Sequence, residues 1–325
     1  MQKDYLQIKN LNIRYYSNNE TVNAVNGIDL ELKDGETLGL VGETGAGKTT
    51  TALSIMGLLP PKVSEIVSGS IVLDGEELVK SPEKKMRLIR GRKVAMIFQD
   101  PMTSLNPLQT VGEQISEMIL LHNHFSKQEL SNQVDELMEK VGLPKGRKTE
   151  YPHQFSGGMK QRVVIAIALA CNPKLLIADE PTTALDVTIQ AQILNLMEDL
   201  KREYHTSMLL ITHDLGIVVE MCDKVAIMYA GEIVESGSVE QIYSTPLHPY
   251  TQGLFNSVPS LDDDKHRLTP IDGLMPDPTN LPAGCHFHPR CPYATELCKT
   301  SPPASEAENG HRVMCWYWEK QKEGN

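Results

Sequence analysis

The chain has 325 residues, which at ~150 residues per domain corresponds to two domains or to one large domain with an appendage. Acidic residues outnumber basic ones, 42 to 31, and the net charge of −11 argues against bulk nucleic-acid binding, which needs a basic face. The longest apolar stretch, 163–171, is much shorter than the ~20 residues that cross a bilayer, and the N-terminal MQKDYLQIKN lacks the apolar core of a signal peptide. We therefore expect a globular cytosolic protein whose membrane contact is at most peripheral.

Short apolar strands alternate with helical patterns along the chain as far as about residue 245. Strands are expected at 5–14, 28–32, 36–41, 69–73, 93–98, 175–178, 208–212, 225–229 and 233–235, the last two joined by a hairpin at Ala230-Gly231. Helices are expected at 49–59, 156–171, 187–204 and 215–221, and a helical period runs from 111 to 141. This alternation predicts an α/β fold with a mainly parallel sheet, into which a helical subdomain of about 105–170 is inserted.

After about residue 245 prolines become frequent and the periodicity fades, so we expect a loop-rich appendage. Four of the six cysteines lie there, and clustered cysteines in a reducing cytosol favour metal or redox chemistry over disulfides. Four thiolates can hold an iron–sulfur cluster or a tetrahedral zinc ion, and the nearby His286 and His288 keep zinc open. A proline-rich linker is the alternative. The cysteines follow the pattern Cys285-x5-Cys291-x6-Cys298-x16-Cys315.

Residues 42–49, GETGAGKT, fit the phosphate-binding loop pattern G-x-x-x-x-G-K-[ST] between an expected strand and an expected helix. The glycines let backbone N–H groups point at phosphate oxygens, and the helix N-terminus adds positive potential. Lys48 would reach the β- and γ-phosphates, and the Thr49 hydroxyl would bind Mg²⁺. The pattern predicts a nucleotide site, without separating ATPases, GTPases and kinases.

Two further segments carry chemistry. The buried strand 175–178 delivers Asp179 and Glu180 at its carboxyl end, where open α/β sheets bind ligands. Asp179 would hold Mg²⁺ and Glu180 could act as general base toward water. In FSGGMKQR, Ser156 caps a helix with a glycine-rich first turn. This is a second helix N-terminus that could bind a phosphate group. Two such helix starts are hard to explain within one active site.

The ordered set of motifs resembles the ATP-binding-cassette (ABC) ATPases over about residues 5–245. Gln99 resembles the Q-loop glutamine, Ala184-Leu185-Asp186 the D-loop, and His213 the switch histidine. Tyr15 stands where the family places an aromatic that stacks on adenine, with Tyr16 as a close alternative. The chain departs from the usual LSGGQ and from the usual serine before the D-loop, without losing a catalytic group. The departures are Phe155, Met159 and Thr183.

The resemblance implies the P-loop NTPase fold of ABC ATPases, with a RecA-like parallel sheet core, an antiparallel β subdomain and an inserted helical subdomain. The nucleotide-binding domain would span 1–245, and a Pro/Cys-rich extension 246–325. Catalytic roles fall to Lys48, Gln99, Glu180 and His213, and Mg²⁺ binding to Thr49, Gln99 and Asp179. The residues implied for ATP binding are Tyr15, Gly42, Glu43, Thr44, Gly45, Ala46, Gly47, Lys48, Thr49, Thr50, Gln99, Ser156, Gly157, Gly158, Asp179 and Asp186.

Paired cassettes of this family pack head to tail, so a chain with one copy of each motif needs a second cassette chain. Segments 99–107, 246–251 and 284–291 resemble the ATPases of oligopeptide/dipeptide importers. That resemblance implies a related second ATPase, two membrane permeases, an extracytoplasmic binding protein and a [4Fe–4S] cluster on the four cysteines. Nickel or another small solute is the alternative cargo. A soluble ABC protein acting on ribosomes or DNA is disfavoured by the acidic charge, and a P-loop kinase or GTPase would lack the SGG motif and His213.

Overall fold

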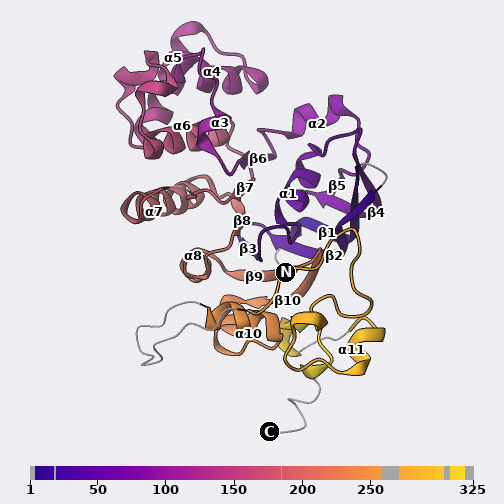
Figure 1. The fold of residues 1–325 in the computed structure, drawn as a ribbon. Coiled ribbons are helices and arrows are strands. Elements are labelled where there is room, and N and C mark those ends of the chain that lie inside the picture. Colours follow the sequence, from indigo (N-terminus) through magenta and orange to yellow (C-terminus); the bar gives the residue numbers. More distant parts are fainter. Residues whose placement is uncertain (1–3, 18–19, 184, 258–270, 304–307, 319–325) are drawn as a thin grey trace. The chain divides into compact units, whose positions relative to one another are not determined.

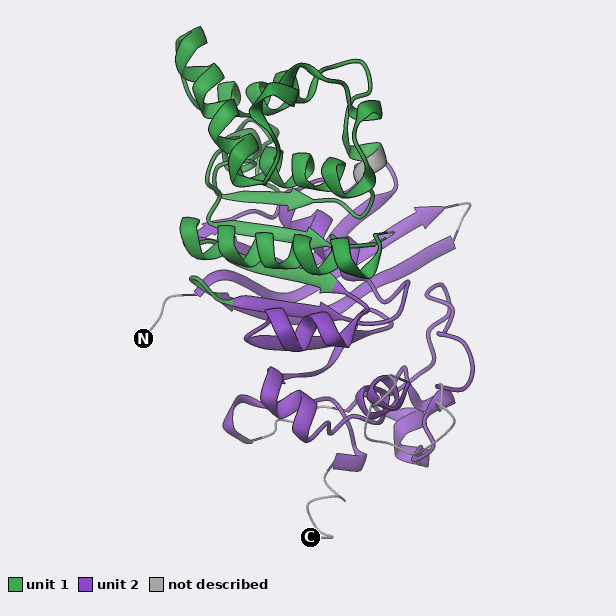
Figure 2. Ribbon diagram, turned by 90° about the vertical axis from the view of Figure 1, so that its left-hand side faces the viewer, with its two compact units in different colours: residues 1–3, 33–36, 80–211 green, residues 4–32, 37–79, 212–325 purple. Residues whose placement is uncertain are grey.

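The computed structural model describes residues 4–17, 20–183, 185–257, 271–303 and 308–318. The chain divides into two compact units, coloured separately in Figure 2. Unit 1 comprises residues 1–3, 33–36 and 80–211, and unit 2 comprises residues 4–32, 37–79 and 212–325. Each unit is described by itself.

Unit 2 contains an antiparallel sheet in the order β2-β1-β4-β5 (Figure 1). Its strands are β1 (Asp4–Ser17), β2 (Glu20–Lys33), β4 (Ser64–Leu73) and β5 (Glu76–Glu77). Alternate residues of β1, such as Leu6 and Ile8, are buried, as expected for a sheet with one face on the core. The expected strand at 28–32 begins earlier, at Glu20, because polar residues extend it where no apolar alternation marks them.

Unit 2 also holds a run of strands in the order β11-β10-β9-β3. These are β3 (Thr37–Val41), β9 (Lys224–Tyr229), β10 (Glu232–Ser238) and β11 (Arg312–Val313). β3 pairs with β9 in parallel, and β9 pairs with β10 through the expected hairpin, where Ala230 and Gly231 have φ of 47° and 84°. The helices of this unit are α1 (Lys48–Met56), α8 (Leu215–Met221), α9 (Val239–Ser244), α10 (Pro249–Asn256) and α11 (Glu296–Thr300), with short 3₁₀ turns η3 (His288–Arg290) and η4 (Glu308–Gly310).

Unit 1 contains three parallel strands in the order β8-β7-β6, and their side chains are buried throughout. The strands are β6 (Val94–Ile97), β7 (Leu175–Asp179) and β8 (Ser207–Thr212). Buried apolar strands of this kind belong to parallel sheets covered on both faces, so the predicted α/β core is confirmed. The helices are α2 (Glu83–Ile89), α3 (Pro101–Ser104), α4 (Val111–His122), α5 (Lys127–Lys140), α6 (Gly157–Leu169) and α7 (Val187–Tyr204), with 3₁₀ turns η1 (Lys145–Thr149) and η2 (Pro152–Gln154).

The helical period of 111–141 is divided into two helices, α4 and α5. Each begins with a capping box, in which Thr110 pairs with Glu113 and Ser126 pairs with Glu129. The second box sits inside the predicted period, so it starts a new helix after a short turn.

The segment after residue 245 packs more than its proline content predicts. Tyr250 of α10 is fully buried against Tyr229, with ring centroids 4.6 Å apart, and Phe287 lies 5.2 Å from the same ring. These aromatic side chains form a core cluster that reaches back to Val41 of β3. Within the expected loop-rich appendage, aromatic burial orders one short helix, α10, that its weak periodicity did not indicate. Among the described helices, none is long and apolar enough to cross a membrane.

Candidate functional site: a nucleotide loop and an acidic strand end

The nucleotide loop 42–49 connects β3 to α1 in unit 2, as the motif requires. Two of its glycines leave no room for a side chain. A Cβ on Gly42 would lie 2.1 Å from the Met228 carbonyl oxygen, and one on Gly47, which has a φ of +107°, would lie 2.4 Å from the Ala24 carbonyl oxygen. The loop is therefore held close to neighbouring backbone, with its curvature set by glycine.

Lys48 is buried at the first position of α1, and its ammonium donates to the carbonyl oxygens of Gly42 (2.6 Å) and Glu43 (3.0 Å). Thr49 is exposed beside it. The Tyr15 hydroxyl lies 3.5 Å from Thr50 Oγ1, which places this half-buried tyrosine at the start of α1. The alternative, Tyr16, is exposed and donates to Glu65 at 2.9 Å. The geometry thus sets Tyr15, rather than Tyr16, beside the nucleotide loop.

Residue 43 of the loop is also contacted by the C-terminal segment. The Glu43 N–H donates to the Tyr250 hydroxyl (3.0 Å), and the Glu43 carboxylate pairs with Arg290 (3.0 Å). Burial, together with the charge of Glu43, raises the pKa of the Tyr250 phenol, so this hydroxyl stays protonated. No sequence pattern pointed to these two contacts.

The acidic pair occupies the end of β7 in unit 1. Asp179 is 2% exposed, and Glu180 follows it with a φ of +47°, a left-handed conformation that is uncommon for glutamate. Glu180 Oε2 accepts hydrogen bonds from Gln99 Nε2 and Thr183 Oγ1, both at 2.9 Å. Gln99 and Glu180, which the sequence singled out separately, therefore meet, and Thr183 is an additional contact that sequence reasoning noted only as a departure.

The SGG segment begins α6, also in unit 1. Ser156 is the N-cap, as predicted, and accepts from the Met159 N–H at 3.4 Å. Gly157 is exposed, while a Cβ on Gly158 would lie 2.5 Å from Ile189 Cγ2 of α7, so this glycine permits close helix packing. Asp186, the last D-loop residue, caps α7 by accepting from the Ile189 N–H. Ala184 lies outside the described residues.

The two departures from LSGGQ share one partner that the sequence did not reveal. The Arg147 guanidinium stacks 4.4 Å above the Phe155 ring, and its Nη1 lies 3.3 Å from Met159 Sδ. The same arginine pairs with Glu150 at 2.6 Å. An aromatic ring and a polarisable thioether suit a guanidinium neighbour, so Phe155 and Met159 form a matched set with Arg147.

The predicted ATP-site residues are distributed over both units. Unit 2 holds Tyr15, the loop 42–50 and His213, which is exposed just before α8. Unit 1 holds Gln99, residues 156–158, the pair 179–180 and Asp186. Within units, the structure brings together Tyr15 with Thr50, and Gln99 with Glu180.

The four cysteines of the C-terminal segment line one small pocket, and no disulfide joins them. Burial, with Cys315, Cys298 and Cys291 nearby, raises the pKa of the Cys285 thiol to about 12, and burial raises that of Cys291 to about 11. Even so, no group of three or more His, Cys, Asp or Glu side chains in the described ranges is arranged to hold a metal ion. The cluster therefore stays a prediction.

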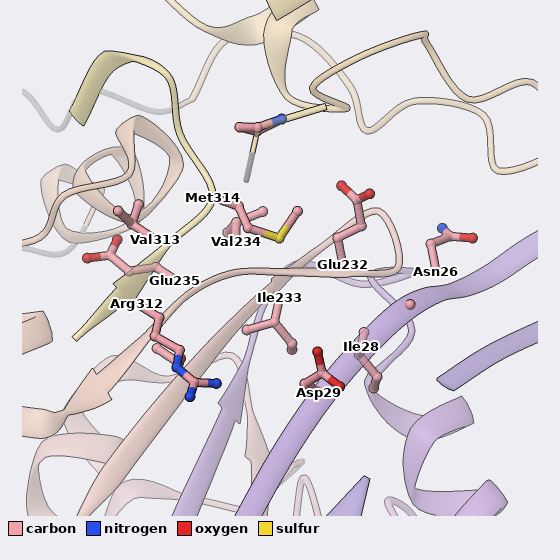
Figure 3. A pocket seen from close by; sticks show the side chains of 13 residues that line it. Asn26, Ile28, Asp29, Glu232, Ile233, Val234, Glu235, Arg312, Val313 and Met314 are labelled. Atoms are coloured by element: carbon pink, nitrogen blue, oxygen red, sulfur yellow. The ribbon is translucent and has the colours of Figure 1, made fainter. Parts of the chain in front are cut away.

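A separate pocket of about 460 Å³ opens in unit 2 beside β2, β10 and β11 (Figure 3). Asp29, Glu232, Glu235 and Arg312 are the charged residues in its lining. Burial raises the pKa of Glu232 to about 7, and its carboxylate lies 3.2 Å from His286 Nδ1. Its lining includes none of the residues predicted for ATP binding, so it is not the candidate nucleotide site.

Comparison with known proteins identifies the family. Residues 25–183 match the ABC transporter family model, and residues 234–298 match the model of the oligopeptide/dipeptide transporter C-terminal region. The oligopeptide transport ATP-binding protein AppD of Bacillus subtilis is 49% identical over 319 residues, which cover 97% of either chain. The dipeptide transport ATP-binding protein DppD of Bacillus subtilis is 48% identical over 321 residues, covering 98% of this chain and 96% of its own.

A solved structure supports the same conclusion. The dimeric post-hydrolysis state of the ATP-binding cassette MJ0796, bound to ADP and Pi, aligns with a TM-score of 0.65 and 27% identity, covering 72% of this chain and 98% of that one. The relatives match almost the full length, the motifs are those expected, and the fold agrees. The chain belongs to the ABC transporter ATP-binding proteins, and within them to those that carry the oligopeptide/dipeptide transporter C-terminal region.

Proposed function

We propose that this chain is the ATP-hydrolysing subunit of an importer that takes up oligopeptides or dipeptides, bound at the cytoplasmic face of the membrane. The observation that carries the proposal is near-half identity, over almost the whole length, to proteins named for oligopeptide and dipeptide transport. In importers of this family, an ATP-binding cassette acts on the solute through membrane permeases. Two permeases and an extracytoplasmic binding protein would complete the assembly.

The site residues have distinct proposed roles. Lys48 and the N–H groups of 42–49 bind the phosphates of ATP, and Thr49, Gln99 and Asp179 hold Mg²⁺. Glu180 accepts a proton from the attacking water, and His213 contacts the γ-phosphate. Tyr15 stacks on adenine. The exposed helix start at 156–158 faces the nucleotide of a second, related cassette, and Asp186 lies at the same junction. The proposed domains are a nucleotide-binding domain of 1–245 and a C-terminal extension of 246–325.

The four cysteines of the tail are proposed to bind one [4Fe–4S] cluster, with zinc as the alternative. Support comes from their shared pocket and from backbone N–H groups at the sulfurs: those of Phe287, Tyr293 and Tyr317 point to Cys285, Cys291 and Cys315 in turn. Hydrogen bonds to sulfur are a common feature of iron–sulfur sites. Binding would displace protons from the thiols, and the cluster would act structurally.

Reconstitution tests the transport function. The chain, expressed together with its permeases and second ATPase, should be recovered as one complex from detergent-solubilised membranes. In proteoliposomes that complex, supplied with its binding protein, should accumulate a labelled di- or oligopeptide only when ATP is present on the side of this chain. If the complex takes up nickel and no peptide, the proposed cargo is wrong and nickel takes its place. ATP-independent association with ribosomes, and no permease, would overturn the importer assignment.

A further inference from the structure

The nucleotide loop is held from outside by the C-terminal segment through Arg290. This arginine, in η3, is 6% exposed, and its Nη1 lies 3.0 Å from Glu43 Oε2, while the Glu43 side chain is 31% exposed. Its other N–H groups donate to the carbonyl oxygens of Asp272 (3.0 Å) and Ile271 (3.4 Å). The guanidinium therefore bridges the tail backbone and the nucleotide loop with its donors fixed at both ends.

All three polar groups of Glu43 have a partner in unit 2. The carboxylate pairs with Arg290, the N–H donates to Tyr250, and the carbonyl accepts from Lys48. Two of those partners belong to the tail, far from the loop in sequence. Glu43 is thus held through its side chain, its N–H and its carbonyl.

We propose that Arg290 is a positioning residue for ATP binding: it holds the start of the nucleotide loop and neutralises the Glu43 carboxylate beside the phosphate site. A loop whose backbone is already oriented loses less conformational entropy when phosphate binds. An unpaired carboxylate next to a triphosphate repels it, and the repulsion is strong where the pair is shielded from water. Both effects favour ATP when Arg290 is present.

The arginine also connects the loop to the aromatic core of the tail. Its guanidinium lies 5.7 Å from the Tyr229 ring centroid and 6.0 Å from that of Phe287. Phe287 stands two residues from Cys285 and lines the cysteine pocket. Disordering the tail is therefore expected to loosen the nucleotide loop as well.

The test measures the affinity of the purified full chain for MgATP by calorimetry. Arg290→Gln should weaken binding about tenfold, since it removes one partner of a largely shielded ion pair. Glu43→Gln alone removes the repulsion together with the tether, so it should weaken ATP binding less than Arg290→Gln does. The double variant Arg290→Gln/Glu43→Gln should bind ATP more tightly than Arg290→Gln alone. Arg312→Gln, at an exposed arginine of the same tail, is the matched control and should match the unmodified chain.

Recovery in the double variant would show that Arg290 acts on ATP binding through the Glu43 carboxylate, because Glu43→Gln would not repair a loss of tail structure. Unchanged affinity in Arg290→Gln, or a double variant as weak as the product of the two single effects, would overturn the proposal. If Arg290→Gln does not fold, Arg290→Lys is the deciding variant. Lysine keeps the positive charge but cannot donate several hydrogen bonds in the geometry of a guanidinium, so a two- to threefold loss of ATP affinity is expected. An affinity equal to that of the unmodified chain would refute the role.

The proposal rests on ATP binding at 42–49, and Lys48→Ala distinguishes the two failures. If Lys48→Ala weakens ATP binding but Arg290→Gln does not, only the role of Arg290 is refuted. If neither changes affinity, the nucleotide site itself is misplaced.

Discussion

At the scale of single residues, Lys48 is the group on which nucleotide binding depends most directly. Its buried ammonium donates to two carbonyl oxygens of the loop and lies where phosphates are expected. Lys48→Ala removes this charge and should abolish tight ATP binding while leaving the fold intact. Calorimetry with MgATP and circular dichroism together check the prediction, with the exposed Lys299→Ala as control. Unchanged affinity would contradict the interpretation of the loop.

Glu180 has the contacts of a positioned base, since Gln99 and Thr183 both donate to its Oε2. Glu180→Gln keeps the shape and removes the basic oxygen, so ATP binding should persist while hydrolysis falls ~10²–10⁴-fold. The variant should accumulate in a closed cassette pair. Phosphate release from the assembled complex is the measurement. Because a partner's site could supply turnover, the partner carries the equivalent inactivating change, and normal hydrolysis in that background would disprove the role.

At this scale, motif order points to residues within the motifs, whereas long-range contacts leave no local pattern. Gln99 was predicted from the family resemblance and Glu180 from the end of a buried strand, and the structure joins their side chains by a hydrogen bond. Arg147 and Arg290 were not chosen, because each acts on residues through the folded chain rather than through a local pattern. No periodicity or spacing in one sequence marks such an arginine.

At the scale of elements, α6 presents an exposed, glycine-rich start with Ser156 as its cap. Ser156→Arg places a long cation there and should block closure over the γ-phosphate bound by a second cassette. This chain should stay folded and keep its own ATP affinity, since Ser156 lies outside unit 2, which holds the loop 42–49.

The measurement for α6 is hydrolysis at the partner's site in the assembled complex. Ser126→Arg, at the exposed N-cap of α5, is a matched control that makes the same change at another helix start of unit 1. Loss with Ser156→Arg and retention with Ser126→Arg support closure in trans. Equal activity in both variants would exclude that arrangement.

Elements with strong periodicity or clear strand ends were predicted, and most of the short helices were not. α7 coincides with its predicted range of 187–204, because one apolar face and the Asp186 cap define it, and the short helix α8 coincides with its predicted range of 215–221. α2 and α9 were missed, since a helix of six or seven residues gives too little periodicity to recognise. The division of 111–141 was missed although the Ser126 capping box was readable from sequence.

At the scale of the whole molecule, the tail should depend on its cysteines. Replacing any one of Cys285, Cys291, Cys298 or Cys315 with serine should remove the proposed cluster and make the tail sensitive to protease. Protein purified without oxygen should be brown, with about four irons and four sulfides per chain. Cys171→Ser, outside the pocket, is the control and should keep its iron. Stoichiometric zinc without iron would decide for a zinc site, and no metal in such protein would refute both.

The overall architecture was predictable because strand–helix alternation and motif order both constrain it, and the solved cassette with a TM-score of 0.65 confirms the fold. The packing of the tail was not predictable. Its order comes from a few aromatic rings, Tyr229, Tyr250 and Phe287, that meet from distant positions. Proline content and fading periodicity predicted a loop-rich appendage there, and neither marks the aromatic residues whose burial orders it.

The pairing of β11 with β10 has a consequence for synthesis. Val313 and Arg312 lie opposite Glu235 and Ser236, so the late strand covers part of the outer edge of β10. An uncovered strand edge is a template for pairing with another chain. The ribosome makes β10 long before β11, so the risk that this edge causes aggregation persists until residues 312–313 have been added.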